Sequence, residues 1–380
     1  MRRRPWYRLA VLFGAAALVL GACSGSDGDS EGASASGGTT EEAGGGETAG
    51  TDGDTVVLTE DGESVLAAVQ AAGTVKCGTR DALPGFAVLD ASGDHVGFDS
   101  DFCRVIAAAV LGDAEKVDHV DLETADRFTA LQSGEVDVLV RNTTWTATRD
   151  GKEGATFLQP NFYDGQGMMV KADSGFTKLA DMSSAVVCVA KGTTTEGNAA
   201  SEATRLGLSW QVQSFDSPEL IQEAFQAERC DGWSSDRSQL TGLRSSYPDG
   251  AASLVILPEV FSKEPLAPAV RDGDSQWAQA VNWAVLATIQ AEELGITQAN
   301  VDQMKSSSDP NVQRFLGVAV GSDPVLDPGL GLPTDFGYQV VKQVGNYGEI
   351  FDRHLTPLGL ERGVNALWTD GGLLYAPPYR

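Results

Sequence analysis

The chain has 380 residues, and its 53 Asp and Glu residues outnumber its 27 Lys and Arg residues, so the formal net charge is -26. This charge argues against binding to nucleic acids and against adsorption to anionic lipid, because both are negatively charged themselves. About 325 residues follow an N-terminal leader and linker, which is enough for two lobes rather than one compact core.

The first residues have the profile of a signal peptide. Three arginines at positions 2–4 precede an apolar run from Leu9 to Leu20 that is too short to span a bilayer comfortably. The run ends in Leu-Gly-Ala-Cys, residues 20–23, which resembles the lipobox of bacterial lipoproteins. The resemblance implies a leader over residues 1–23, a lipid on Cys23 and an exported protein anchored to the outer face of the cytoplasmic membrane. The alternative is an ordinary signal peptide with a chance cysteine.

The next segment has the composition of a linker. Residues 24–54 contain no Lys or Arg and almost no large apolar residue, so they cannot form a core. A flexible chain of this length has a root-mean-square reach of about 30 Å. We therefore expect a disordered acidic tether over residues 24–55.

The body then alternates strand patterns with helix patterns, which is typical of an α/β fold. The first elements are expected at residues 74–79 (strand), 99–111 (helix), 116–121 (strand), 127–133 (helix) and 136–140 (strand). In the first helix, Cys103, Ile106, Ala107 and Val110 fall on one face, with Asp99 as the expected N-cap. That face is predicted to be core.

The pattern breaks near residues 160–167 and then restarts. Strands are expected at 185–190, 211–215, 231–235 and 254–257, and helices at about 193–206, after the Ser217 cap with Pro218 in first position, at 275–294 and at 338–355. Extended crossings near Tyr163 and Ser262 would join two lobes. We expect lobe 1 over residues 56–165, lobe 2 over 166–262, and a return to lobe 1 with a C-terminal helical extension over 263–380.

Three loops are expected to meet where the lobes face each other, because ligands of open α/β sheets bind outside the carboxyl ends of the strands. They span residues 77–86, 142–149 and 190–198. The second is rich in hydroxyls and ends in Arg149, whose planar guanidinium suits a carboxylate. The alternative is a capped turn with a surface arginine. The third leads into a helix whose free amides can bind an anion.

Metal and cofactor motifs are absent from the sequence. Its three histidines are far apart, and no cysteine or histidine pair has the spacing of a zinc site. The glycines do not form a phosphate loop or a dinucleotide motif. We therefore expect neither a metal nor a cofactor.

From about Gly73 to Arg380 the chain resembles the amino-acid-binding subunits of bacterial ABC importers, the family 3 solute-binding proteins, and within them the general L-amino-acid-binding group. The resemblance is carried by RFTALQSGEVDVLVRNTTWT, YDGQGMMV, SKEPLAPAV, AEELG, NYGEIF and NALWTDGGLLYAPPYR. It implies a two-lobed, type 2 periplasmic-binding-protein fold with a hinge of two crossing segments. It also implies a monomer that closes on a free L-amino acid and delivers it to a membrane permease.

The resemblance also implies a set of ligand-binding residues. Arg149 matches the arginine that holds the α-carboxylate, and Asp236 matches the aspartate that accepts from the α-ammonium. Further contacts are implied for Asn142, Thr143, Thr144, Thr193 and Thr194.

The resemblance also implies a side-chain selectivity, through one departure from the family pattern and through matching arginines. Leu83 stands where many relatives stack an aromatic residue on the ligand. Arg80 and Arg127 match arginines that some binders of acidic amino acids place against the ligand side chain, and Arg141 is expected to join them. An acidic or amide ligand is therefore favoured: glutamate, aspartate, glutamine or asparagine. The alternatives are that Arg80 pairs with Asp81 and that Arg127 only begins a helix beside Asp126.

The sequence leaves two other functions open. An enzyme on the same fold, such as a cyclohexadienyl or arogenate dehydratase, would need an acidic residue in the cleft, and Glu196 or Asp81 could be proposed. No nucleophile and base pair or catalytic motif supports this, so no catalytic residue is expected. A sensory ectodomain is the third possibility, although no transmembrane or cytoplasmic segment is evident in the sequence.

Four of the five cysteines remain once Cys23 is assigned to lipid, and an even number in an oxidising compartment predicts two disulfides. Four cysteines allow three pairings. We predict Cys77 with Cys103 and Cys188 with Cys230, one bridge in each lobe. Cys77 lies on the opening strand and Cys103 on the buried face of the helix expected to cover it. Pairing within lobes leaves hinge motion free.

Overall fold

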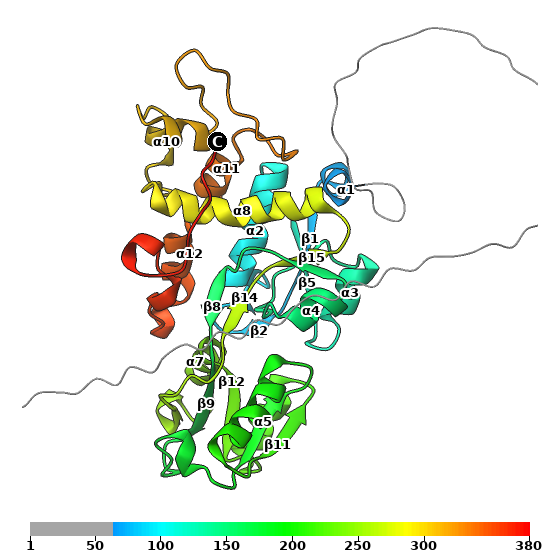
Figure 1. Cartoon of the computed structure of the whole chain (residues 1–380), viewed down its shortest axis with the longest axis vertical. Coiled ribbons are helices and arrows are strands. Elements are labelled where there is room, and N and C mark those ends of the chain that lie inside the picture. Colours follow the sequence, from blue (N-terminus) through cyan, green and yellow to red (C-terminus); the bar gives the residue numbers. More distant parts are fainter. Residues whose placement is uncertain (1–63) are drawn as a thin grey trace, which may run out of the picture. The chain divides into compact units, whose positions relative to one another are not determined.

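The computed structural model describes residues 64–380. The expected leader, with Cys23, and the expected tether lie outside these described residues. Within them the chain builds two lobes, each around its own five-stranded sheet, with β8 and β14 running between them (Figure 1). The α/β, two-lobed fold with two crossing segments is thereby confirmed. Among the described helices, none is long and apolar enough to cross a membrane.

Lobe 1 is built on a sheet with the strand order β5-β1-β6-β15-β7. Its strands are β1 (Val75–Thr79), β5 (Val117–Asp121), β6 (Val138–Leu139), β7 (Ala155–Phe157) and β15 (Ala269–Arg271). β1 runs parallel to β5 and β6, whereas β15 runs antiparallel to β6 and β7. The strand expected at residues 136–140 is thus shorter than predicted, and Val136 and Val140 are buried just outside it.

The helices of lobe 1 cover this sheet and one another. They are α1 (Val65–Ala72), α2 (Phe98–Leu111), α3 (Arg127–Ser133), α4 (Ala147–Lys152) and α8 (Ser275–Glu293). α2 is buried on nearly every side because it packs against β1, α8 and α11. The prediction that Asp99 caps α2 was wrong: Gly97 is the N-cap, and Asp99 lies in the first turn.

Lobe 2 is built on a sheet with the strand order β11-β10-β12-β9-β13. Its elements are β9 (Gln166–Lys171), β10 (Val186–Ala190), β11 (Gln211–Phe215), β12 (Gly232–Asp236), β13 (Leu254–Ile256), α5 (Thr194–Leu206), α6 (Pro218–Gln226) and α7 (Arg237–Ser245). β10 runs parallel to β11 and β12, and β9 runs antiparallel to β12 and β13. Ser217 caps α6 as predicted, since its hydroxyl accepts from the Leu220 amide.

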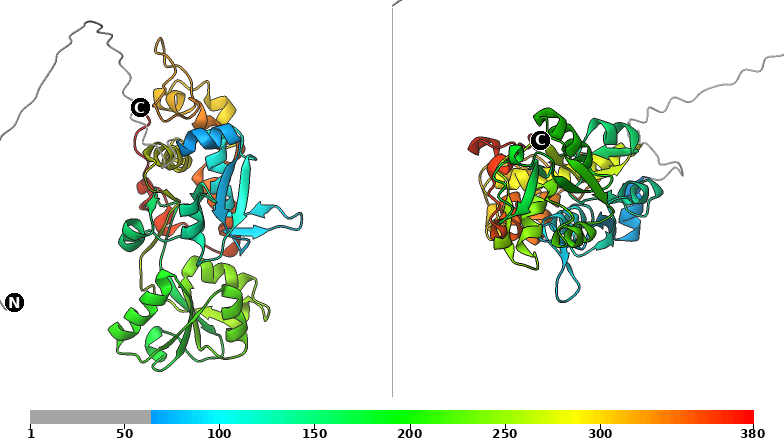
Figure 2. Two further views of the ribbon diagram at one scale, coloured as in Figure 1. Left: turned by 90° about the vertical axis from the view of Figure 1, so that its right-hand side faces the viewer. Right: turned by 90° about the horizontal axis from the view of Figure 1, so that it is seen from below.

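Two short antiparallel strands connect the lobes, and a small arm projects from lobe 1. The connecting strands are β8 (Phe162–Asp164) and β14 (Glu264–Leu266), in which Asp164 faces Glu264. The arm consists of β2 (Ala82–Leu83), β3 (Ala87–Leu89) and β4 (His95–Val96) and stands away from the lobe in the left view of Figure 2.

The C-terminal extension is helical and packs on lobe 1. Its helices are α9 (Val301–Met304), α10 (Pro310–Phe315), α11 (Phe336–Gln343) and α12 (Tyr347–His354). It also contains the 3₁₀ turns η3 (Thr356–Leu358), η4 (Gly363–Asn365) and η5 (Trp368–Asp370), whereas η1 (Leu179–Asp181) and η2 (Ala251–Ser253) lie in lobe 2. The single helix predicted over 338–355 was wrong. Gly345 has a φ of 110° and interrupts the helix, and Asn346 then caps α12 through a capping box.

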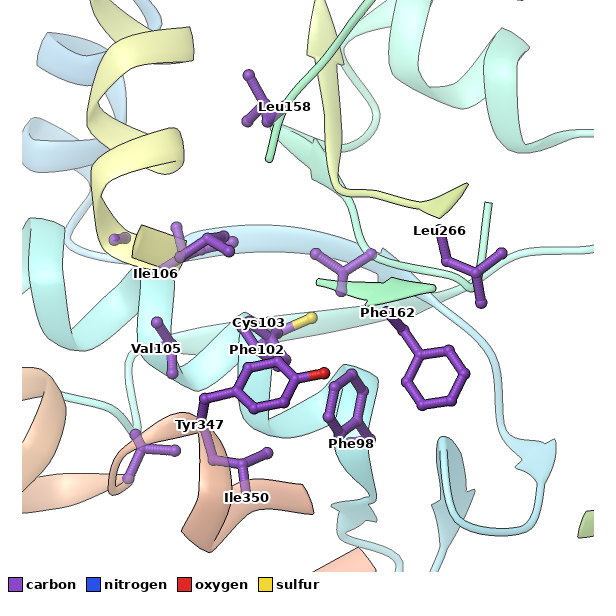
Figure 3. Packing of buried hydrophobic residues seen from close by; sticks show 14 of the residues in the cluster. Phe98, Phe102, Cys103, Val105, Ile106, Leu158, Phe162, Leu266, Tyr347 and Ile350 are labelled. Atoms are coloured by element: carbon purple, nitrogen blue, oxygen red, sulfur yellow. The ribbon is translucent and has the colours of Figure 1, made fainter. Parts of the chain in front are cut away.

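An aromatic cluster joins the C-terminal extension to the base of the crossing strands (Figure 3). The Phe98 ring of α2 lies 5.8 Å from the Phe162 ring of β8 and 5.8 Å from the Tyr347 ring of α12, measured between centroids. The Tyr347 hydroxyl donates to the carbonyl oxygen of Asn161 at 2.8 Å. The residues just before β8 are therefore anchored to lobe 1 and to its extension.

Two disulfides link the four cysteines in the described part of the chain. Cys77 is bonded to Cys103, which ties β1 to α2, and Cys188 is bonded to Cys230, which ties β10 to the residues before β12. These are the pairs predicted from the sequence. Each bridge stays within one lobe.

Candidate functional site

A narrow cavity of about 40 Å³ lies between the lobes where the three expected loops meet. Eight of the nine predicted ligand-binding residues line it: Arg80, Arg127, Asn142, Thr144, Arg149, Thr193, Thr194 and Asp236. Thr143 does not line it. Its hydroxyl donates to the carbonyl oxygen of Arg141, and its own carbonyl oxygen accepts from the Ala267 amide. Thr143 therefore holds the loop in place.

Arg149 is held on a short helix rather than in the loop where the sequence placed it. Thr146 is the N-cap of α4, and its hydroxyl accepts from the Arg149 amide at 3.2 Å. Nη1 of Arg149 donates to the carbonyl oxygen of Thr144 at 2.8 Å. The first bond fixes the backbone of Arg149 and the second holds its guanidinium in the cavity wall, where its other nitrogens make no hydrogen bond within the described residues.

Four arginines in the cavity wall are buried without a carboxylate partner. Arg80, Arg127, Arg141 and Arg149 are each at most 9% exposed. Within residues 64–380, none of them lies within 4.0 Å of a carboxylate oxygen. Burial lowers the pKa of all four, and the pKa of Arg127 falls to about 9. Buried cations are costly unless paired, so this wall favours a negatively charged ligand.

Asp236 offers an acceptor on the opposite side. It is the last residue of β12 and is buried. Within the described chain its Oδ1 has no hydrogen-bond partner. Burial, helped by the nearby Asp164 and Glu264 carboxyls, raises its pKa well above the usual range. Burial also raises the pKa of Asp164 in β8 to about 6, although the Ser238 amide donates to its Oδ2. A cation placed here would stabilise the ionised forms.

The cavity also contains residues that the sequence analysis missed. These are Thr124, Ala190, Thr195, Pro218, Ser235 and Gln239. Gln239 lies on α7 one turn after Asp236, and this helical spacing from a predicted ligand residue could have revealed it. Nδ2 of Asn142 donates to Oε1 of Gln239 at 3.3 Å, and Nη2 of Arg127 donates to the carbonyl oxygen of Gly192 at 3.3 Å. The lobes are thus in direct contact across the cavity.

Arg80 and Arg127, each of which has an alternative structural role in the sequence, both belong to the cavity wall. Arg80 makes no ion pair with Asp81; its Nη1 donates to Asn142 at 3.4 Å. Arg127 begins α3 and also lines the cavity. Glu196 accepts from the Gly192 amide and the Ser214 hydroxyl and is not part of the cavity wall. No group of His, Cys, Asp or Glu among the described residues could hold a metal ion.

Comparison with known proteins gives a consistent set of relatives. The family of bacterial extracellular solute-binding proteins, family 3, matches residues 75–299. The chain is 48% identical over 322 residues to the general L-amino acid-binding periplasmic protein AapJ of Rhizobium johnstonii, covering 83% of this chain and 93% of that protein. It is 44% identical over 321 residues to the glutamate/glutamine/aspartate/asparagine-binding protein BztA of Rhodobacter capsulatus, covering 83% and 94%.

A solved structure agrees with these sequence matches. The periplasmic binding protein of an ABC transporter from Brucella ovis, with glutathione bound, superposes with a TM-score of 0.81 at 43% identity. The match covers 84% of this chain and all of that one. The resemblance noted from the sequence motifs is confirmed.

Proposed function

This chain belongs to family 3 of the bacterial extracellular solute-binding proteins, and we propose that it captures an L-amino acid between its lobes and delivers it to the permease of an ABC importer. One observation carries the proposal: four buried arginines share a cavity wall with Asp236, and within residues 64–380 the arginines have no carboxylate partner and Oδ1 of Asp236 has no hydrogen-bond partner. An α-amino acid has a carboxylate for the first and an ammonium for the second. The ligand carboxylate would be the partner of the arginines, and the ligand ammonium would be the partner of Asp236.

In this proposal, Arg149 holds the α-carboxylate together with the Thr193 and Thr194 segment at the start of α5, and Asp236 accepts from the ammonium. Arg80, Arg127 and Arg141 then face the ligand side chain. They repel lysine and arginine and offer donors to a carboxylate or an amide. The preference is therefore for glutamate, aspartate, glutamine or asparagine, the four amino acids after which BztA is named.

A larger ligand is a second candidate, because the Brucella ovis relative holds glutathione. Glutathione is a γ-glutamyl tripeptide, so its glutamyl end keeps both the α-ammonium and the α-carboxylate. That end would satisfy Asp236 and Arg149 in the same way. No observation favours the dehydratase considered above.

Capture would use the crossing strands as a hinge. β8 and β14 are the two segments that connect the lobes through the cavity region, and closure about them would bury the ligand. The contacts of Arg127 with Gly192 and of Asn142 with Gln239 support a conformation with the lobes together. The protein acts as a monomer in this scheme.

Calorimetric titration of the purified protein with all common amino acids tests the proposal. Glutamate, aspartate, glutamine and asparagine should bind most tightly, and lysine and arginine most weakly. Tightest binding of lysine would contradict the side-chain assignment. Failure of every amino acid and of glutathione to bind would overturn the proposed function.

We further propose that the chain is exported, cleaved before Cys23 and held on the outer face of the cytoplasmic membrane by a lipid on that residue, with residues 24–55 as the tether. The family is described as extracellular, which supports export. Cys23→Ser should release the protein from the membrane fraction, whereas Ser24→Ala should not. A Cys23→Ser protein as firmly membrane-bound as the parent would contradict the anchor.

A further inference from the structure

A second cavity of about 310 Å³ adjoins the first. The two share four residues of their walls: Arg80, Arg141, Pro218 and Gln239. The second cavity lies between lobe 1, including the β2 end of the arm, and the helices α6 and α7 of lobe 2. It therefore adjoins the proposed site at this shared wall.

The shared wall lies on one side of the first cavity. Arg149, Thr193, Thr194 and Asp236 line the first cavity but not the second. If these residues hold the α-carboxylate and the α-ammonium, only the ligand side chain can point toward the second cavity. The second cavity is therefore placed to receive what is attached to the end of that side chain.

The two guanidiniums of the shared wall are buried but incompletely bonded. Arg80 makes one side-chain hydrogen bond, at 3.4 Å to Asn142, within the described residues. Arg141 donates through Nε to the carbonyl oxygen of Leu122 at 2.7 Å and through Nη2 to the Thr124 hydroxyl at 3.2 Å. Both side chains are more than nine-tenths buried, so donors that face the cavities need acceptors.

The outer wall of the second cavity, by which we mean the part that the first cavity does not share, has the opposite charge. Asp81, Glu123 and Glu219 line it, whereas Asp236 is the one carboxylate that lines the first cavity. A ligand side chain that passes Arg80 and Arg141 into the second cavity therefore meets hydrogen-bond donors first and acceptors next. An amide has this order of groups, because its carbonyl oxygen accepts and the N–H that follows donates.

The volumes of the two cavities also favour a ligand larger than a single amino acid. The first cavity, at about 40 Å³, is far below the 300 to 1,000 Å³ that is usual for small-molecule sites, and the second brings the combined space into that range. A single amino acid would leave the larger part of this space to water.

We propose that the second cavity binds the amide-linked extension of a γ-glutamyl amide or peptide, whose glutamyl end occupies the first cavity. This rests on the proposed function. The linkage has to be γ, because an α-linked peptide would use up the carboxylate that Arg149 holds. Arg80 and Arg141 bind the γ-carbonyl oxygen, and the carboxylates of the outer wall face the N–H that follows it.

Ala82→Trp tests the proposal by filling the second cavity. Ala82 is an exposed residue of β2 that lines this cavity and not the first. Ala91→Trp is the matched control, since Ala91 is exposed in the loop between β3 and β4 of the same arm and lines neither cavity. Binding of L-glutamate, L-glutamine, γ-L-glutamylglycine and α-L-glutamylglycine is measured by calorimetry for the parent and both variants, with thermal unfolding as the folding check.

The parent should bind γ-glutamylglycine but not its α-linked isomer. Ala82→Trp should weaken γ-glutamylglycine by about tenfold or more and change glutamate binding by less than about twofold, and Ala91→Trp should change neither. A parent that binds glutamate or glutamine but not γ-glutamylglycine contradicts the second cavity alone, even if Ala82→Trp does not fold. Equal losses for both ligands in Ala82→Trp also contradict it. A parent that binds none of the four, and none of the other common amino acids in the titrations described above, contradicts the proposed function itself.

Discussion

Asn365 bonds to both backbone groups of Tyr163, the middle residue of β8. The Tyr163 amide donates to Oδ1 of Asn365 at 2.7 Å, and Nδ2 of Asn365 donates to the Tyr163 carbonyl oxygen at 2.9 Å. On the other strand Tyr163 faces Pro265, which has no N–H to donate. The Asn365 side chain thus takes the place of a neighbouring strand and ties the C-terminal extension to a crossing segment.

Replacing Asn365 with Ala should destabilise the protein. Both backbone groups of Tyr163 would lose their partner, and an unsatisfied buried group costs about 1 to 3 kcal/mol. The free energy of unfolding, measured with urea, should therefore fall by about that amount or more. Asn311→Ala is the control, because Asn311 is exposed and its side chain makes no hydrogen bond within the described residues. Equal stability of the two variants would show that the bond pair is dispensable.

Arg149 and Asp236 should each be required for every amino-acid ligand. Removing one partner of a desolvated charge pair costs about 2 to 5 kcal/mol of binding. Arg149→Ala and Asp236→Ala should therefore weaken acidic, amide and apolar ligands alike in calorimetric titrations. Lys152→Ala is the control, because Lys152 lies on the same helix α4 but is exposed. Parent-like affinity in either site variant would remove that residue from the proposed site.

Ligand binding should release a proton below neutral pH. Without ligand, the raised pKa values of Asp236 and Asp164 keep these carboxyls protonated. An ammonium beside them favours the ionised forms, so affinity should rise with pH between about 5 and 7, by at most about tenfold per pH unit for each proton. Calorimetry in buffers of different ionisation enthalpy counts the protons. Ligand binding to the Asp236→Asn variant should release fewer protons than ligand binding to the parent.

A third buried carboxyl, that of Asp99, should affect the stability of the ligand-free protein. Burial raises the pKa of Asp99 to about 7, so the folded chain holds a proton that the unfolded chain has already lost. Stability contributed by this proton is present below the unfolded pKa of about 3.8 and is lost as the pH rises through about 7. Asp99→Asn should therefore flatten the decline in urea midpoint between about pH 4 and pH 8. A slope identical to that of the parent would contradict the assignment.

Local patterns were enough to predict most of the fold. Ser217 followed by Pro218 predicts the start of α6, and alternating strand and helix patterns predict both sheets, because these signals depend on neighbours in sequence. The break between α11 and α12 was missed, since an apolar helical pattern continues across Gly345 and hides the capping box that begins at Asn346. Asp99 was misassigned because its neighbours in space, Asn142 and Arg80, are distant in sequence.

The family motifs predicted most of the residues that line the candidate cavity, but not their electrostatics. No local pattern indicates that Arg80, Arg127, Arg141 and Arg149 are all buried with no carboxylate partner in the described part of the chain, because this results from long-range packing. The second cavity was missed for the same reason. Its wall combines the arm after β1 with α6 and α7, which are brought together by the closing of the two lobes.

Each disulfide should stabilise the lobe that contains it. The bridges close loops with sequence separations of 26 and 42, for which the chain-entropy model predicts about 3 to 4 kcal/mol each. Replacing Cys77 and Cys103 together by Ala, or Cys188 and Cys230 together, should lower the free energy of unfolding by about that amount. Because the pairs lie in different lobes, the effects should add. A cross-lobe link found by non-reducing peptide mapping would refute this pairing.

Arg80 should determine side-chain selectivity rather than binding as such. In the proposed pose its guanidinium faces the end of the ligand side chain, so Arg80→Ala should weaken glutamate and aspartate more than alanine or leucine, which have no acceptor there. The loss should appear in the dissociation rate, since a direct contact acts after encounter. Lys263→Ala is the control for long-range steering, because Lys263 is exposed beside β14 and should affect only the association rate, in a way that salt suppresses. Equal losses for acidic and apolar ligands in Arg80→Ala would mean that this arginine supports the loop and does not read the side chain.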